Sequence, residues 1–353
     1  MASLGCWEEQ FSLLIRCFIS KHSWRVAELE LRRKLTASPL GSVLSAGIEQ
    51  PVELIRLFKC FLFIFAVCLL HVVLCSAGGS SGIGEAVARE LARCGARVVL
   101  ATRNAVRGEE AAWRIRRDTG NPEVLFMPLD LSSLRSVHAF AAAFLQQEPN
   151  LHLLINNAGE QHSTDGFSLP FQVNHLGHFL LTQLLLQRLQ SSAPSRVLIV
   201  ASSAHQAGRL CMAKLGQPPP GPFAAFQDYC NSKLANVLHA RQLAARLQGT
   251  GVTAYAVHPG FVHTQLFRHT PLWLQPLWTP LSRFCFRSAA EGARTVLFCA
   301  TQDGLQPFSG CYFADCRPLQ PCAQGRDDAA ARELWERSER LLGLQPSLCT
   351  PVE

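Results

Sequence analysis

The sequence has few charged residues and no concentrated basic segment. Asp, Glu, Lys and Arg make up 17% of the 353 residues, whereas hydrophobic residues make up 48%. This balance excludes an intrinsically disordered chain and indicates a contact with lipid. The net charge of +7 is spread over many arginines, whereas a nucleic-acid-binding protein gathers such charges in one region with aromatic residues between them. We therefore expect no nucleic-acid partner.

The sequence also lacks the signatures of a metal site or a disulfide framework. Its 14 cysteines are scattered, and none pairs with another at the spacing of zinc ligands or of a redox Cys-x-x-Cys motif. Cys311, Cys316 and Cys322 are spaced too widely for either. His175 and His178 face one side of an expected helix without a third ligand, which favours a structural role. We predict no metal and a reduced environment that faces the cytosol.

The N-terminal part of the chain carries no motif that indicates chemistry. Residues 1–57 show weak helical patterning, and residues 58–71 contain the apolar run CFLFIFAVCLL, which continues after His71 into VVLC. A membrane span needs about 20 apolar residues, so a full span would consume the strand expected next. We expect a membrane-associated segment without a clean span, and a short soluble helix is the alternative. A cleaved signal peptide is disfavoured because the run begins far from Met1.

From residue 72 onward, short apolar segments alternate with amphipathic helical patterns. This rhythm predicts βαβ units and a Rossmann-type, doubly wound α/β fold, in which helices cover both faces of a parallel sheet. We expect a single catalytic domain over 72–345 and a tail over 346–353. The expected strands are 72–76, 97–101, 124–129, 151–156, 196–201, 252–257 and 310–314. The expected helices are 83–94, 105–118, 132–147, 172–190, 228–248, 288–301 and 327–342.

A glycine-rich loop, AGGSSGIG at 77–84, directly follows the first expected strand. Glycines let the backbone approach a pyrophosphate closely, and the helix that begins there offers free N–H groups and a partial positive charge. The strand–loop–helix context therefore predicts a dinucleotide-binding loop. The same residues match the G-x-S-x-G elbow of α/β-hydrolases, but that fold normally places several strands before its elbow.

The end of the second expected strand indicates which dinucleotide binds. An NAD-dependent enzyme has an acidic residue there, about 20 residues past the loop, which binds the ribose 2′-hydroxyl. This chain has Thr102-Arg103-Asn104 instead. Arg103 suits a 2′-phosphate, so we predict NADP(H) as the cofactor. The alternative is that Arg103 is a solvated surface side chain.

Tyr229 and Lys233 stand four residues apart in an expected helix, so both side chains project from one face. A lysine charge about 4 Å from a phenol is worth up to roughly 4 kcal/mol at an effective dielectric of 20, or about three pKa units. We therefore predict a tyrosine with a lowered pKa that exchanges a proton near neutral pH. Ser202 and Ser203 end the strand RVLIVASS at the carboxyl edge of the sheet, where a hydroxyl can bind a substrate oxygen next to Tyr229.

Other polar positions are expected around the same edge of the sheet. The amides of Asn156-Asn157-Ala158-Gly159, after the fourth strand, are expected to brace the sheet and wall the adenosine pocket. Asn174 lies near the start of a helix, where a buried amide is unfavourable unless it holds water or backbone. Pro259, Gly260 and Thr264 follow the sixth strand and are expected to shape the nicotinamide pocket.

Together these motifs resemble the short-chain dehydrogenase/reductase family, from about Val72 to the C-terminal helix. The strings NNAG, VNHLGHFLLT, YCNSKLANVL, LQGTGVTAYAVHPG and SGCYFADC are similar to its retinol dehydrogenase branch. The resemblance implies hydride transfer between a nicotinamide and an alcohol or carbonyl carbon. It implies Tyr229 as proton donor and acceptor, with Lys233 as modulator of its pKa and ribose ligand. It also implies Ser203 as the residue that orients the carbonyl and Asn174 as the holder of a proton-relay water.

The resemblance and the motifs together define the expected cofactor contacts and partners. The branch implies an N-terminal anchor in the endoplasmic reticulum, a cytosol-facing catalytic domain, and a small hydrophobic substrate such as a retinoid or lipid aldehyde. A cytoplasmic protein is expected instead if the apolar segment folds into the domain. The sequence also allows a homodimer. The expected cofactor contacts are Gly78, Ser80, Ser81, Gly82, Ile83, Arg103, Asp130, Asn157, Ala158, Gly159, Tyr229, Lys233, Pro259, Gly260 and Thr264.

Three departures from the family pattern leave a second hypothesis open. Ala77 replaces the usual Thr that opens the glycine motif, and the segment 160–166 is shorter than usual. Glu160 stands where an apolar residue is expected, at the border of the substrate pocket. The polar linker between the anchor and the first strand is also missing. The second hypothesis is therefore a non-catalytic, membrane-associated scaffold that binds the nucleotide.

Overall fold

The computed structural model describes residues 73–159, 168–221, 223–260 and 288–345. They belong to one compact unit that spans Ile64–Glu353. The predictions for residues 1–57, 58–71 and 346–353 lie outside the described residues. Within the described ranges, no helix is both long enough and apolar enough to cross a membrane.

The described strands form one sheet in the order β3-β2-β1-β4-β5-β6-β7-β8, in which β1 to β7 pair in parallel and β8 is antiparallel to β7. The strand order reverses at β1, so the crevice at the carboxyl ends of β1 and β4 is the topological switch point where such folds bind ligands. The predicted doubly wound fold is confirmed. The strands are β1 (Val73–Ala77), β2 (Arg97–Thr102), β3 (Val124–Pro128), β4 (Leu153–Asn156), β5 (Ser195–Val200), β6 (Val252–His258), β7 (Tyr312–Ala314) and β8 (Arg317–Leu319).

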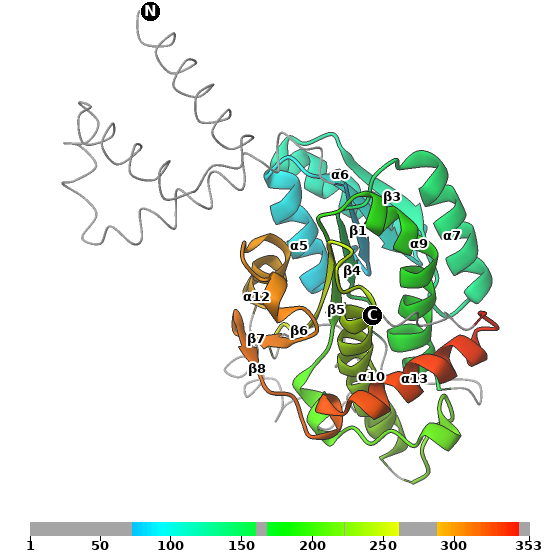
Figure 1. The fold of residues 1–353 in the computed structure, drawn as a ribbon. Helices are drawn as coiled ribbons and strands as arrows, with labels where there is room; N and C mark the ends of the chain where they lie inside the picture. The colour runs from blue at the N-terminus through cyan, green and yellow to red at the C-terminus, as the bar shows by residue number, and fades with distance from the viewer. Residues whose placement is uncertain (1–72, 160–167, 222, 261–287, 346–353) are drawn as a thin grey trace, which may run out of the picture. The chain divides into compact units, whose positions relative to one another are not determined.

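Helices cover both faces of the sheet (Figure 1), and a hydrophobic core packs against each face. Side chains from α5 (Gly82–Arg93), α6 (Ala105–Thr119) and α12 (Ala289–Thr301) pack with alternate strand residues in one core. The other core contains α7 (Leu134–Gln147), α9 (His178–Ser191) and α10 (Ala224–Arg246). The C-terminal helix α13 (Asp328–Leu341) packs along α10. Strand residues alternate between the two cores because successive side chains point to opposite faces.

The helix expected at 172–190 has a different form from the one predicted. It consists of α8 (Leu169–Phe171), a π-helical turn η1 (Gln172–Gly177) and then α9. A π-turn widens the helix and is frequently found at functional sites. Here it contains Asn174, which is fully buried.

The strand β8 is also absent from the sequence prediction. It pairs with β7 through a two-residue turn in which Asp315 and Cys316 have φ angles of 50° and 58°. Such turns usually contain Asn or Gly, so Asp-Cys gave no hairpin signal. The remaining short helices are η2 (Ser203–Ala207), η3 (Met212–Lys214), η5 (Gln306–Phe308) and η6 (Gln324–Arg326).

Candidate active site

The glycine-rich loop lies at the carboxyl end of β1, as predicted. Gly78 has a φ of +83°, and a Cβ there would lie 2.8 Å from the Ala158 Cα. A Cβ at Gly84, in the first turn of α5, would overlap the Gly78 carbonyl oxygen. The loop therefore packs too closely against its neighbours for side chains at these positions. The N-terminus of α5, with its partial positive charge, stands at the switch point where a pyrophosphate would bind.

The segment that follows β4 joins this loop to the rest of the site. The Asn157 side-chain amide donates to the Gly78 carbonyl oxygen at 3.3 Å, and the Asn157 N–H donates to the Ala77 carbonyl oxygen at 3.2 Å. Asn156 is fully buried, and its amide donates to the Thr182 hydroxyl of α9 at 2.9 Å. These amides brace the sheet as expected.

Tyr229 and Lys233 are both buried on α10, at 9% and 3% exposure. The Lys233 Nζ donates to the Val200 carbonyl oxygen at the end of β5, at 3.0 Å. The Asn236 side-chain amide donates to the same oxygen at 3.1 Å. The Lys233 Nζ lies 5.6 Å from the centre of the Tyr229 ring. The predicted pair is thus assembled at the carboxyl edge of the sheet.

The pKa of Tyr229 moves in the opposite direction to the prediction. Burial raises it to about 12, and a hydrogen bond with the Ser202 side chain only partly offsets this rise. Burial also lowers the pKa of Lys233 to about 8. The charged form of each group is destabilised because both groups are removed from water. The sequence spacing placed the two side chains on one helix face but did not reveal their depth of burial.

The serine hydrogen-bonded to Tyr229 is Ser202, whereas the family resemblance implied Ser203 as the residue that orients the carbonyl. Ser202 is in an extended conformation, with φ −158° and ψ 158°, and its hydroxyl accepts from the Ala204 N–H at 3.2 Å. The 3₁₀ turn η2 begins at Ser203. The chain therefore changes direction between the two serines, and the Ser202 side chain is the one hydrogen-bonded to Tyr229.

Asn174 is linked to the Tyr229 backbone through Ser232, a residue that the sequence reasoning missed. The Asn174 amide donates to the Ser232 hydroxyl at 2.9 Å, and that hydroxyl donates to the Tyr229 carbonyl oxygen at 2.7 Å. A Cβ at Gly159 would lie 3.7 Å from the Lys233 Nζ and 3.8 Å from the Asn174 Oδ1. The Gly159 backbone thus lies close to both polar groups. Ser232 was recognisable only by its position three residues after Tyr229.

The buried histidines near Asn174 have contacts typical of core residues. His178 Nδ1 lies 3.1 Å from the Asn174 carbonyl oxygen, and His175 Nε2 lies 2.9 Å from the Ser338 hydroxyl of α13. Burial lowers the pKa of His175 to about 3 and that of His178 to about 4. Both rings are therefore neutral at pH 7. Among the described residues, no group of three ligands able to hold a metal ion is found.

The predicted cofactor contacts outside the catalytic cluster lie along the same edge of the sheet. Arg103 is exposed directly after β2, and Asn104 caps α6 by accepting from the Arg107 N–H at 2.9 Å. Asp130 follows β3, where its carboxylate accepts from the Ser132 N–H at 2.9 Å. Ser80, Ser81, Gly82 and Ile83 form the loop and the first turn of α5, and Pro259 and Gly260 follow β6. Thr264 and the segment 160–166 lie outside the described residues.

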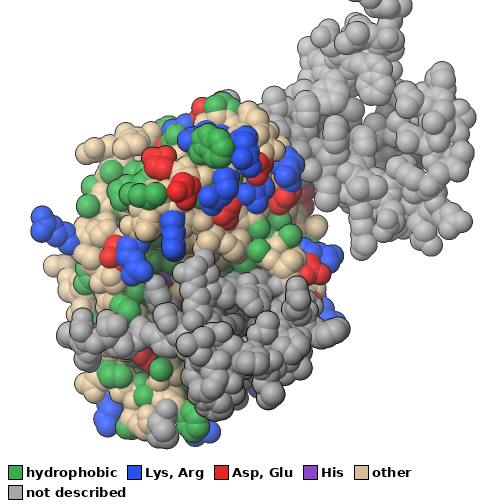
Figure 2. Space-filling model, turned by 180° about the vertical axis from the view of Figure 1, so that it is seen from behind, with side chains coloured by type: hydrophobic (Ala, Val, Ile, Leu, Met, Phe, Trp, Pro, Cys, Tyr) green, Lys and Arg blue, Asp and Glu red, His purple; other side chains and the backbone are tan. Residues whose placement is uncertain are grey.

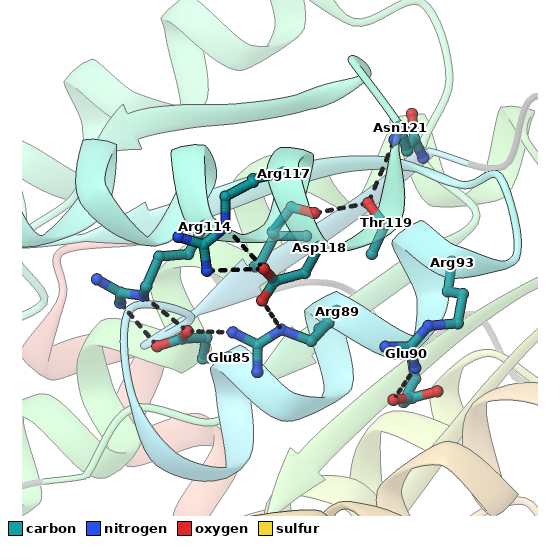
Figure 3. Close-up of polar contacts among 10 residues, drawn as sticks. Glu85, Arg89, Glu90, Arg93, Arg114, Arg117, Asp118, Thr119 and Asn121 are labelled. Atoms are coloured by element: carbon teal, nitrogen blue, oxygen red, sulfur yellow. Dashed lines mark hydrogen bonds and ion pairs between the residues drawn. The ribbon is translucent and has the colours of Figure 1, made fainter.

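An ion-pair network joins α5 to α6 (Figure 3). Glu85, in the first turn of α5, accepts from Arg89 at 2.8 Å and from Arg114 of α6 at 3.0 Å. Arg89 also pairs with Asp118 at 3.3 Å. Figure 2 shows basic and acidic side chains interspersed on the face seen from behind. The two arginines screen the carboxylate that would otherwise repel an anion at this helix end.

Comparisons with known proteins agree with this arrangement. A family model described as short chain dehydrogenase matches residues 72–275. Dehydrogenase/reductase SDR family member 13 of Bos taurus is 54% identical over 273 residues, which cover 76% of this chain and 72% of that protein. Retinol dehydrogenase 12 of Homo sapiens is 50% identical over 273 residues, which cover 76% of this chain and 85% of that protein. A solved RhlG/NADP active-site complex of Pseudomonas aeruginosa has a TM-score of 0.56 and 25% identity, and it covers 74% of this chain and 96% of that one.

Proposed function

The chain belongs to the short-chain dehydrogenase/reductase family and is an oxidoreductase related to the retinol dehydrogenases, and on this basis we propose that it uses NADP(H) to interconvert an alcohol and an aldehyde or ketone. The observation that carries the proposal is the convergence of Tyr229, Lys233 and Ser202 at the carboxyl edge of the sheet, beside the glycine loop. In a fold of this type, that edge is where a dinucleotide and its substrate meet.

The residues present fit a nicotinamide dinucleotide. The close packing around Gly78 and Gly84 leaves backbone and a helix N-terminus exposed to a pyrophosphate, and the Gly159 backbone lies close to Lys233 and Asn174. When bound, the cofactor supplies the hydride acceptor or donor at its nicotinamide ring. Two observations support NADP(H) over NAD(H): Arg103 follows β2 where an acid would select NAD, and the RhlG relative is an NADP complex.

Tyr229 is suited to donate a proton to the substrate oxygen. With a pKa of about 12, its phenol stays protonated at neutral pH, and the alkoxide that forms during carbonyl reduction is a much stronger base. The Ser202 hydroxyl stands beside the phenol and can hydrogen-bond the same oxygen. Transfer from Tyr229 to this oxygen is therefore favourable.

Lys233 is suited to return the proton to Tyr229. Its pKa of about 8 lies close to physiological pH, which is where a group exchanges protons most effectively. We assign Lys233 to a relay that continues through a water held by Asn174. The burial of Asn174 in the π-turn supports this assignment, as does the position of its Oδ1, which like the Lys233 Nζ lies near Gly159.

The substrate proposed is a small hydrophobic carbonyl compound or alcohol, of the retinoid or lipid-aldehyde class. The similarity to retinol dehydrogenase 12 supports this choice. We also propose that residues 58–71 associate the protein with the membrane of the endoplasmic reticulum, which the apolar run in this segment supports. A homodimer stays a prediction.

The test is to incubate the purified full-length protein with NADPH and a panel of retinal, medium-chain aldehydes and steroid ketones, and to follow NADPH oxidation by absorbance. We expect turnover with at least one compound. Tyr229→Phe should abolish turnover and leave NADPH binding intact, because the phenol oxygen is the group that moves the proton. NADPH binding without oxidation of NADPH across the panel would favour the scaffold hypothesis instead.

A further inference from the structure

His205 is a fully buried histidine in η2, three residues after Ser202. Its Nδ1 lies 2.6 Å from the Ser202 carbonyl oxygen. On the other side of the ring, the Cys322 backbone N–H donates to Nε2 at 3.3 Å. The ring centre also lies 4.7 Å from that of Tyr312 in β7. This one side chain therefore joins the loop that bears the serine to the segment between β8 and η6.

The two hydrogen bonds determine the protonation state of the ring. A carbonyl oxygen only accepts, so Nδ1 carries the hydrogen that points at Ser202. A backbone N–H only donates, so Nε2 presents its lone pair to Cys322. A neutral imidazole with its hydrogen on Nδ1 satisfies both partners, and a protonated ring does not. Burial lowers the pKa of His205, which agrees with a neutral ring.

A second set of contacts holds the same two segments together. The Gln324 side chain accepts from the Leu210 N–H at 3.4 Å and donates to the Leu210 carbonyl oxygen at 3.3 Å. The Cys322 thiol lies 3.6 Å from the His205 carbonyl oxygen. The segment 322–324 therefore runs along the loop 205–210 and contacts it at both ends. This segment stands beyond residues 72–275, which the family model matches.

We propose that His205 is a positioning residue that holds Ser202 toward Tyr229, and that the C-terminal segment 322–324 holds His205 in place. The Ser202 carbonyl oxygen accepts from the His205 backbone N–H at 3.1 Å as well as from its ring. These two donors fix the peptide plane that follows Ser202 and thereby the direction of its hydroxyl. The inference rests on the proposed function and adds a contribution of the C-terminal region to catalysis.

The test compares two amide substitutions at this position. In His205→Asn, the amide nitrogen takes the place of Nδ1 and can still donate to Ser202. In His205→Gln, the amide reaches only the place of Nε2, so the donor to Ser202 is lost. We expect the glutamine variant to lower kcat by about 10- to 100-fold through misplacement of the serine. We expect the asparagine variant to stay within a fewfold of the wild type, with KM for NADPH unchanged in both.

A double-mutant cycle separates positioning from a general structural effect. In a Ser202→Ala background, His205→Gln should lower kcat no further, because its effect passes through the serine hydroxyl. His152→Gln is the matched control, since the His152 Nδ1 accepts from the Val73 N–H at 3.2 Å at the opposite edge of the sheet. That variant should leave kcat unchanged even if it lowers stability.

The outcomes distinguish this inference from the proposed function. Wild-type protein without turnover across the panel refutes the function itself. Wild-type turnover combined with equal kcat losses in the asparagine and glutamine variants, or with a full additional loss in the Ser202→Ala background, refutes the positioning role alone. If the glutamine variant does not fold, Gln324→Ala is used in its place. If Gln324→Ala lowers kcat in the wild type but not in the Ser202→Ala background, the inference is supported. If Gln324→Ala leaves kcat unchanged, the inference is contradicted.

Discussion

Replacement of Lys233 by methionine should stabilise the protein while abolishing its activity. Burial lowers the pKa of this lysine from 10.5 to about 8, which corresponds to about 3 kcal/mol by which its charge destabilises the native state. The substitution also removes the hydrogen bond from Nζ to the Val200 carbonyl oxygen, a loss of about 1 kcal/mol. The Asn236 amide still donates to that oxygen, so no buried acceptor is left unpaired. We expect a net gain of about 2 kcal/mol at pH 7 in the free energy of unfolding.

The gain should depend on pH in a defined direction. Below pH 8 the lysine is protonated in both the native and the unfolded chain, so the wild type bears the full destabilisation. Between pH 8 and 10.5 the native lysine has lost its proton and the unfolded one has not, so wild-type stability rises with pH. The advantage of the methionine variant should therefore shrink across this window, and above it the wild type should be the more stable by about 1 kcal/mol, the value of the lost hydrogen bond.

The measurement is urea unfolding of the full-length chain at several pH values, followed by tryptophan fluorescence. Lys214→Met is the matched control, because Lys214 is exposed and its substitution should change neither stability nor turnover. A methionine variant at Lys233 that is no more stable than the wild type at pH 7 would refute the reasoning. An advantage that stays constant from pH 7 to 10.5 would refute it too, because the gain would then not come from the charge.

The remaining predictions concern the serine and the cofactor phosphate. Ser202→Ala should lower kcat by about 10²- to 10³-fold, as loss of one hydrogen-bond donor to a reacting oxygen does, whereas Ser203→Ala should stay within about twofold in the same steady-state assay. Equal losses in both variants would contradict the assignment of Ser202. Arg103→Asp should shift the ratio of kcat/KM for NADPH and NADH toward NADH by about 10- to 100-fold, through loss of a charge-assisted hydrogen bond. Arg332→Asp on α13 is the charge-matched control, and unchanged selectivity in the Arg103 variant would remove that residue's role.

The pKa values of Tyr229 and Lys233 indicate the protonation state of each group in the site. Burial disfavours both the phenolate and the ammonium ion, so at pH 7 the Tyr229 phenol is protonated, whereas Lys233, with a pKa of about 8, is still mostly an ammonium ion. The phenol is thus ready to give a proton, as carbonyl reduction requires. For alcohol oxidation the phenol must first lose its proton, which is unfavourable at neutral pH.

Much of the fold follows from the sequence because its signals are local. A buried strand such as β2 is recognisable in the sequence as a short apolar run, and the glycine-rich loop comes directly after β1. The spacing of Tyr229 and Lys233 places both on one helix face whatever surrounds the helix. Strand boundaries agree with the predictions to within about two residues. These features depend on backbone geometry over a few residues, which the chain specifies for itself.

Other features of the site depend on contacts between distant parts of the chain, and only the tertiary structure determined them. The hydrogen bond of Tyr229 with Ser202 depends on where the chain turns after β5 and on the position of α10. Asn174 meets Ser232 across 58 residues, and His205 meets Cys322 across 117. The direction of the Tyr229 pKa shift depends on how much water the packed elements exclude. The local sequence thus determined which side chains are available and which helix or strand carries each of them. Tertiary packing determined which of these side chains touch and in which direction their pKa values shift.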